Sequence, residues 1–306
     1  MIKLGKILML ATTLCIFACE EPVELGLPQE EAKLGIISEF APDRPFEVTV
    51  TNSISSISSA PIGFLVNATV TIFEGEKEFE LLQLTRSDDD ETPPYFFSRS
   101  KASSTMNEEY HIAVEAPGYP TARASDIIPD QTPIDVFEVE NFQKRSEQAG
   151  YDLEVDFQFT PLPEHNYYHL ILYYERISAF PNPPTGEILI SQLDALPLDN
   201  VDGNPLYQNH FLRGILLKAS DFNAATAKIA LKTTVYPGQA FQVDQNVIAE
   251  LRTVSEDYYR FHSTFTRHLS QQDSIVGQAI VLHNNIENGL GTFAAYNYVQ
   301  DTISLE

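Results

Sequence analysis

The sequence predicts a mainly β protein, with a β-sandwich over residues 34–128, a second β-rich domain over residues 135–306 and one long amphipathic helix near residues 245–270. Apolar and polar residues alternate with a period of two through much of the chain, as in strands with one buried face. Pro and Gly turn signals separate these runs. One stretch instead repeats its apolar residues at spacings of three and four, which is typical of a helix face.

In the N-terminal half, alternation begins near residue 34 and is clearest at Phe46, Val48 and Val50, which are separated by polar residues. A longer run of the same kind covers residues 64–72. Shorter runs follow at residues 79–84, 95–97 and 110–114, the last of which is ended by the Pro117-Gly118 turn signal. Short strands at this spacing, with no helical pattern between them, predict a β-sandwich.

The second half starts after a connector at residues 129–133 (PDQTP). Alternation returns in residues 152–159, and the Tyr-rich stretch 167–177 is apolar on both faces, as in a central strand. Residues 178–210 contain five prolines and no clear period, which predicts a long loop and a candidate contact surface. Further strands are expected at residues 211–217, 228–236 and 284–298.

The helix is predicted from one apolar stripe, for which Asp244 is a candidate N-cap. The stripe consists of Val247, Leu251, Val254, Tyr258, Phe261, Phe265 and Leu269. The charged residues between them, among them Glu250, Arg252 and Asp257, are expected to face mostly outward. We interpret the stripe as core packing against a sheet, with docking to a partner as the alternative.

Residues 1–18 predict a lipoprotein signal peptide. Lys3 and Lys6 precede an apolar run that is shorter than the about 20 residues a membrane-spanning helix needs. Ala18 stands directly before Cys19, as in a lipobox, so Cys19 is expected to be acylated and to become the first mature residue. Two or more acyl chains anchor a protein stably. The alternative is an ordinary signal peptide whose cleavage site falls near a cysteine.

Residues 19–33 predict a flexible acidic tether between the lipid and the folded part. Glu20 and Glu21 follow the cysteine directly, an arrangement that resembles an export signal of Bacteroidota surface lipoproteins. It favours the cell surface, and a merely solvated linker, which leaves the periplasmic face open, is the alternative.

The composition limits the classes of partner. The formal net charge of -24 disfavours nucleic acid and anionic membrane surfaces, because binding to either rests on Lys and Arg. Cys15 and Cys19 are the two cysteines of the chain, and the first is expected to leave with the signal peptide while the second is lipidated. No disulfide is therefore expected.

Acidic and histidine residues offer weak metal candidates, and no cofactor is predicted. Four consecutive carboxylates suit a hard cation such as calcium but lack the spacing of an EF-hand loop, and we interpret them as a solvated hairpin tip. They are Asp88, Asp89, Asp90 and Glu91. His165 and His169 begin a predicted strand, where four residues span about 13 Å, so both rings cannot reach one zinc ion. His262 and His268 are interpreted as surface residues on the helix.

No catalytic motif stands out. Gly289-Leu290-Gly291 lacks the strand-to-helix context and the Lys of a phosphate-binding loop, and we interpret it as a turn. A nucleophile elbow of the form G-x-S-x-G does not occur in the chain. We therefore predict no catalytic residues.

Three segments together resemble a family of Bacteroidota lipoproteins grouped as domain of unknown function 4249. They are Gly118-Tyr119 leading to Ile128-Pro129, Leu251 to Ser255 leading into Tyr258-Tyr259, and Asn285 to Phe293 (NIENGLGTF). The resemblance covers nearly all of the mature chain. It implies an immunoglobulin-like or transthyretin-like N-terminal sandwich, association with TonB-dependent outer-membrane transporters, and no established activity or site residues.

The leading hypothesis is a non-catalytic outer-membrane lipoprotein, bound to outer-membrane lipid through acylated Cys19. It is expected to assist a TonB-dependent transporter, by capturing a ligand of unknown identity or by capping the barrel. The alternatives are a surface hydrolase acting on glycan or peptide, and an adhesin or structural surface protein.

Overall fold

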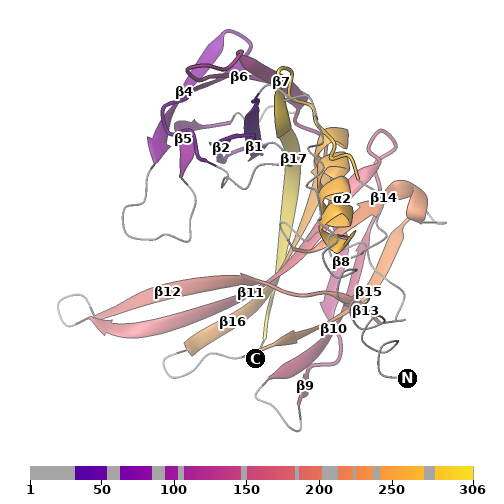
Figure 1. Ribbon diagram of the computed structural model, residues 1–306. Coiled ribbons are helices and arrows are strands. Elements are labelled where there is room, and N and C mark those ends of the chain that lie inside the picture. Colours follow the sequence, from indigo (N-terminus) through magenta and orange to yellow (C-terminus); the bar gives the residue numbers. More distant parts are fainter. Residues whose placement is uncertain are drawn as a thin grey trace, which may run out of the picture. The chain divides into compact units, whose positions relative to one another are not determined.

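The computed structural model shows a mainly β protein, with two sheets and one α-helix among the residues it describes, which confirms the predicted class (Figure 1). The described residues are 32–53, 63–84, 94–102, 107–145, 150–182, 186–201, 213–222, 225–236, 242–271 and 280–305. They belong to one compact unit that spans Ala32–Glu306. No helix among them is long and apolar enough to cross a membrane.

The larger sheet has twelve strands in the order β12-β11-β16-β17-β1-β2-β5-β4-β3-β6-β7, and β14 pairs with β11. Its first strands are β1 (Leu34–Phe40), β2 (Pro45–Asn52), β3 (Thr69–Glu74), β4 (Lys77–Leu84), β5 (Tyr95–Lys101), β6 (Glu109–Glu115) and β7 (Ala122–Ile127). The others are β11 (Tyr167–Asn182), β12 (Gly186–Ala195), β14 (Ile215–Lys218), β16 (Gln242–Val254) and β17 (Gly289–Ser304).

The smaller sheet has the order β13-β15-β10-β8, with β9 paired to β10. Its strands are β8 (Ile134–Val139), β9 (Gln143–Lys144), β10 (Tyr151–Phe159), β13 (Asp199–Asn200) and β15 (Ala227–Val235). A 3-10 turn, η1 (Ala219–Asp221), follows β14, and the helix α2 (Glu256–Gln271) follows β16.

The alternating sequence pattern forms strands because each such strand buries one face. In β2, Phe46, Val48 and Val50 are buried, as the pattern predicts. In β10 the same holds for every second residue from Leu153 to Phe159. These side chains belong to two separate hydrophobic cores, one around the strands β1 to β7 and one between β10, β11, β15 and β16.

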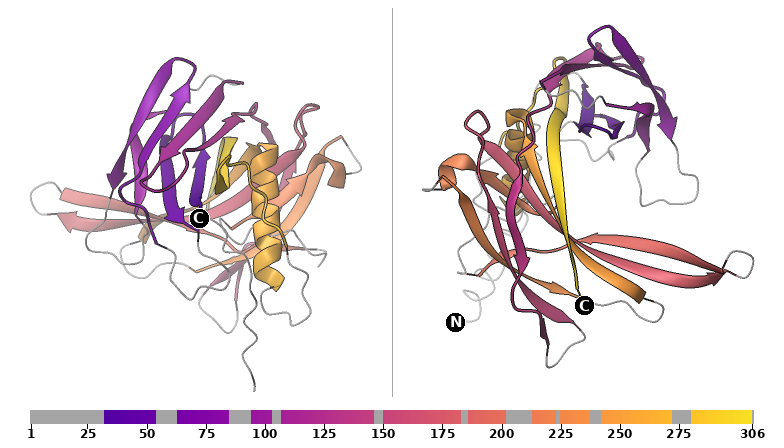
Figure 2. Two further views of the ribbon diagram at one scale, coloured as in Figure 1. Left: turned by 45° about the horizontal axis from the view of Figure 1, so that its top comes forward. Right: turned by 180° about the vertical axis from the view of Figure 1, so that it is seen from behind.

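The last strand, β17, joins both parts of the larger sheet. Its first half pairs in parallel with β1, from Gly289 to Ala295, and its second half pairs antiparallel with β16, from Tyr296 to Ser304. Figure 2 shows this long yellow strand running along both neighbours. The sequence pattern assigns the strand to the C-terminal region alone. Phe293 and Ala295 nevertheless complete the core of the N-terminal strands.

The predicted helix starts about ten residues too early, because its first part is the strand β16 and α2 begins only at Glu256. β16 lies between β11 and β17, and all its residues from Ala249 to Val254 are buried. A strand buried on both faces shows no clean alternation, so its apolar residues matched the helical spacing by coincidence. Asp244 is therefore not the N-cap. Ser255 caps α2, with its hydroxyl accepting the Tyr258 amide at 3.2 Å.

The predicted loop over residues 178–210 is largely a hairpin. β11 continues to Asn182, and β12 pairs with it from Ala195 back to Gly186. Pro181 lies within β11 and suggested a loop, although proline is tolerated at the edges of sheets. β16 pairs with β11 only as far as Ser178, so the hairpin extends beyond its neighbours as a two-stranded arm (Figure 1). Residues 202–210 lie outside the described part.

Candidate functional site

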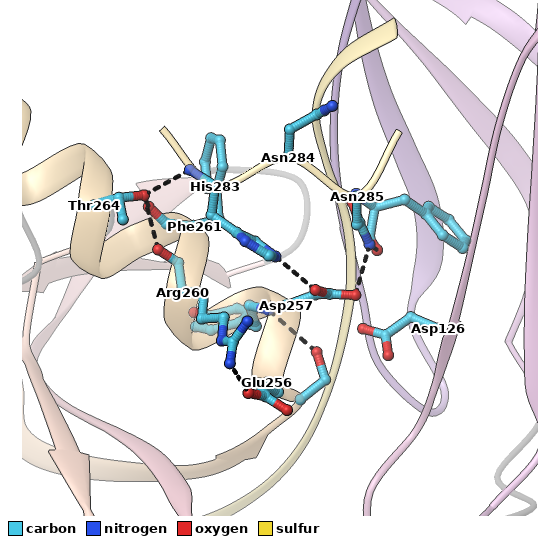
Figure 3. Close-up of polar contacts among 12 residues, drawn as sticks. Asp126, Glu256, Asp257, Arg260, Phe261, Thr264, His283, Asn284 and Asn285 are labelled. Carbon is cyan, nitrogen blue, oxygen red and sulfur yellow. Dashed lines mark hydrogen bonds and ion pairs between the residues drawn. The ribbon is translucent and has the colours of Figure 1, made fainter. Parts of the chain in front are cut away.

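The three sequence segments that suggested the family meet where β16 passes into α2 (Figure 3). Asp126, from the end of β7, accepts the Ala295 amide of β17 at 2.7 Å. Ser255, at the start of α2, donates its own amide to the Ala295 carbonyl at 3.0 Å. Ala295 of β17 is thus hydrogen-bonded both to the end of β7 and to the start of α2.

Asp257 anchors the segment that precedes β17 to the first turn of α2. Its carboxylate lies 2.6 Å from Nε2 of His283 and accepts Nδ2 of Asn285 at 3.0 Å. Asn285 also brackets Phe293, donating to its carbonyl at 2.8 Å and accepting its amide at 3.1 Å. A carboxylate at this end of a helix is favoured by the helix dipole. The arrangement fixes the entry into β17.

Asp126 lies close to Asp257 in this cluster (Figure 3). Burial raises the pKa of Asp126 to about 6, although hydrogen bonds from Ser255 and from the amides of Ala295 and Ile127 oppose the shift. The nearby charge of Asp257 adds to it. The fold therefore favours the protonated form of this carboxyl group more than water does, and the group ionises as the pH rises through about 6.

This shift predicts a pH-dependent stability. Because the folded-state pKa of Asp126 is raised, its contribution is fully present below about pH 4 and is lost as pH rises through about 6. Relative to Asp126→Asn, which does not titrate, the free energy of unfolding of the wild type should fall by about 2 kcal/mol between pH 4 and 7. Chemical denaturation at a series of pH values measures this, and a difference that does not change with pH would refute it.

A second polar cluster is buried on the helix-covered face of β16. Glu250 and Arg252 lie two residues apart on that face, and Arg252 Nε donates to Glu250 at 2.6 Å. The Arg252 guanidinium also lies over the Tyr296 ring, 4.3 Å from its centroid. Arg44 and Gln300 reach the other oxygen of Glu250, at 3.2 and 2.7 Å.

Both charged residues were expected to face outward, and that expectation is wrong, because they lie in a central strand and not on a helix surface. Glu250 is 1% exposed and Arg252 6%. Burial alone would raise the pKa of Glu250, but the charges of Arg252 and Arg44 lower it below its ordinary value. The cluster is therefore ionised and internally paired.

His169 extends this cluster. Its Nε2 lies 2.7 Å from the Arg213 carbonyl oxygen and must donate to it, so Nδ1 accepts the Tyr258 hydroxyl at 2.9 Å. Tyr258 in turn accepts Arg252 Nη1 at 3.1 Å. Burial, with the charge of Arg252, lowers the pKa of His169 well below its ordinary value, so the ring is neutral. His165 takes no part in this series of hydrogen bonds, and its Nε2 lies 3.4 Å from Asp130 Oδ2.

The sequence predicts His262 as a surface residue, which is wrong, because the structure shows that it is buried. It follows Tyr258 by one helical turn and shares the face of α2 that packs against the sheet. Its Nε2 lies 2.7 Å from Glu39 Oε1 of β1. His268 is half-buried near the end of the same helix.

A pocket of about 370 Å³ lies beside the Asp257 cluster, on β6 and β7. Arg123 of β7 pairs there with Glu287 through both backbone groups, at 3.1 and 2.7 Å. The lining consists of His111, Ile112, Arg123, Ala124, Ser125, Asn285 and Glu287. Donors and acceptors are both present, so the pocket suits a small polar ligand.

The other predicted site residues lie outside the described part of the chain. They are Cys19 and the acidic group Asp88, Asp89, Asp90 and Glu91, whose assignments stay predictions. Within the described residues, no three His, Cys, Asp or Glu side chains lie close enough to hold a metal ion.

No sequence motif predicts the polar clusters as sites. His283 lies outside the family segments, and its partner Asp257 comes from a distant part of the chain. Arg252 and Asn285 are among the quoted residues, while Asp126 and Asp257 lie within the stretches that the other quoted pairs enclose. The polar residues in those segments are thus the sequence feature from which the clusters could have been predicted.

Fold and clusters together define a mainly β protein whose strand–helix junction is fixed by polar residues from three distant segments. The family model described as a domain of unknown function (DUF4249) matches residues 20–302, and the chain therefore belongs to that family. A comparison with curated proteins finds no match.

Proposed function

We propose that the protein is a non-catalytic lipoprotein of the outer membrane, facing the cell surface, which assists a TonB-dependent transporter. It contacts the transporter through the arm, defined here as Ser178–Asn182 of β11 and Gly186–Ala195 of β12. This arm lies within the segment that the sequence analysis selects as a contact surface.

The observation that carries the proposal is the apolar exposure of the arm. Ile188 is 47% exposed, Leu189 65%, Ile190 52% and Leu193 50%. Burying apolar surface gains about 25 cal/mol per Å², so a strand that exposes large apolar side chains on both faces favours an interaction site. A partner that covers the arm would explain why these apolar side chains are exposed in the isolated chain.

The sequence around the predicted lipidation site also supports the proposal. The family match starts at residue 20, directly after Cys19, where the mature chain is predicted to begin. The predicted tether then joins Cys19 to the first described residues. A lipid anchor of this kind holds an acidic protein beside a membrane that its charge would not attract.

The pocket beside Asp257 favours a second candidate, the capture of a small polar ligand for the transporter. Its mixed donors and acceptors, among them Arg123, Asn285 and Glu287, carry this alternative. The two roles differ in the surface that matters, which is the arm for capping and the pocket for capture.

Affinity purification of the tagged full-length chain from detergent-solubilised outer membranes tests the proposal. We expect an outer-membrane barrel of the TonB-dependent class to co-purify with the wild type. Cys19→Ala, as the control, should lose both palmitate labelling and recovery from the membrane fraction. Recovery of no barrel protein with the wild type would contradict the proposed function.

A further inference from the structure

β12 is the terminal strand of the larger sheet, with β11 as its neighbour in the strand order. Among the described strands, none pairs with its outer edge. An edge of this kind presents a row of backbone N–H and C=O groups that another strand can use.

The register shows which residues of β12 present these groups. Leu196 donates its amide to the Leu172 carbonyl at 2.8 Å, so this opposite pair is hydrogen-bonded across the hairpin. Inward and outward backbone groups alternate along an antiparallel strand. The pairing continues without a shift to Gly186, so Glu187, Leu189, Ser191 and Leu193 direct their backbone groups away from β11.

The side chains of β12 do not protect this edge. Natural edge strands are usually blunted by charges, proline, bulges or short length. The six residues from Ile188 to Leu193 contain no charge and no proline, and β12 is ten residues long. Its apolar side chains alternate between both faces, Ile188 and Ile190 on one and Leu189 and Leu193 on the other.

Lipid does not fit this edge. An apolar arm would enter a bilayer only if its backbone groups were satisfied, and an open strand edge leaves them unpaired in hydrocarbon. A protein strand satisfies them by continuing the sheet, while its own side chains cover both apolar faces of β12.

Charge distinguishes between the proteins that could supply such a strand. Glu187 and Asp194 stand at the two ends of the uncharged stretch, and Arg176 pairs with Asp194. A second copy would bring another body of net charge -24 to the same place, which disfavours self-association. A strand with Lys or Arg at its ends complements this edge.

We propose that β12 accepts an extended apolar strand with basic ends from a partner protein, as a further strand of the larger sheet. This inference deepens the proposed function and rests on it for the identity of the partner, the transporter. The strand would pair with the outward backbone groups of Leu189 and Ser191.

The substitution Ser191→Pro distinguishes edge pairing from simple apolar contact. Ser191→Pro removes one outward N–H while the inward hydrogen bonds to β11 remain. Ser191→Ala is the matched control, because it also loses the hydroxyl bond to Glu175 but keeps the N–H. Circular dichroism checks that both variants fold as the wild type does.

The probe is a labelled peptide of nine residues in total, five alternating Val and Thr residues with two lysines at each end. Its binding is followed by fluorescence anisotropy. We expect wild type and Ser191→Ala to bind it alike and Ser191→Pro to bind at least tenfold more weakly. The same peptide with glutamate ends should also bind more weakly. Since no transporter is present, failure here leaves the proposed function to the membrane experiment.

Equal affinity of Ser191→Pro and Ser191→Ala, or no binding by the wild type, would overturn the inference. So would a dimer of the wild type, detected by sedimentation, that Ser191→Pro abolishes, because the occupant would then be a second copy. Binding of the non-lipidated chain to phosphatidylethanolamine vesicles, lost in Leu189→Ser, would equally overturn it in favour of lipid.

Discussion

Arg252→Ala should lower the free energy of unfolding by about 3–5 kcal/mol, because it leaves the buried carboxylate of Glu250 without its closest partner. The substitution also removes the donor to Tyr258 and the cation over the Tyr296 ring. Arg44 still reaches Glu250, but its side chain is 36% exposed and it cannot replace the lost contacts. Denaturant unfolding followed by fluorescence of the tyrosines measures the change.

Arg260→Ala is the matched control for this prediction. Arg260 pairs with Glu256 on the surface of α2, where both side chains are more than half exposed. Exposed pairs of this spacing contribute about 0.3–0.5 kcal/mol. If Arg252→Ala and Arg260→Ala cost the same, the Arg252 cluster does not stabilise the junction as described.

Gly291→Ala should cost at least about 3 kcal/mol, since it combines a steric overlap with backbone strain. Gly291 lies in β17 beside β1, and its φ of +118° is a conformation that residues with a side chain rarely adopt. A Cβ there would overlap the Ile36 carbonyl oxygen. The substitution should therefore weaken the parallel pairing that joins the two parts of the larger sheet.

Gly75→Ala is the control that distinguishes the cost of backbone strain from the cost of steric overlap. Gly75 also has a positive φ, of +57°, but no atom lies within 4 Å of the position of an added Cβ. Its cost should be limited to the backbone strain, about 1–2 kcal/mol. Thermal unfolding of both variants, with amide hydrogen exchange of β1, distinguishes them. Similar losses, with β1 protected equally in both, would contradict the role given to Gly291.

The sequence predicts the parts of this fold that depend on local periodicity. β2 and β10 bury one face each, so their alternation identifies them. The same alternation does not identify β16, because both of its faces are buried in the protein. The pairing of β17 with β1 joins residues more than 250 positions apart, and no local pattern encodes it.

The candidate sites divide in the same way. The lipidation of Cys19 follows from a contiguous motif and stays a prediction on the sequence alone. The clusters around Asp257 and Arg252 depend on tertiary contacts, such as those of His283 and Arg44, that sequence spacing does not show. The prolines of residues 178–210 predict a loop, but the structure places Pro181 within the strand β11.

Shortening the arm tests whether this chain contacts an outer-membrane transporter through it. Residues 179–189 are replaced by Asn-Gly, a two-residue turn that suits the opposite pair Ser178 and Ile190. The variant keeps Cys19 and the rest of the sheet, and palmitate labelling checks that it is anchored as well as the wild type.

Both proteins are then purified by affinity from the same solubilised outer membranes. We expect the wild type to recover a TonB-dependent barrel and the shortened variant to recover at least tenfold less of it. Equal recovery by the two proteins, or no barrel with the wild type, would contradict it.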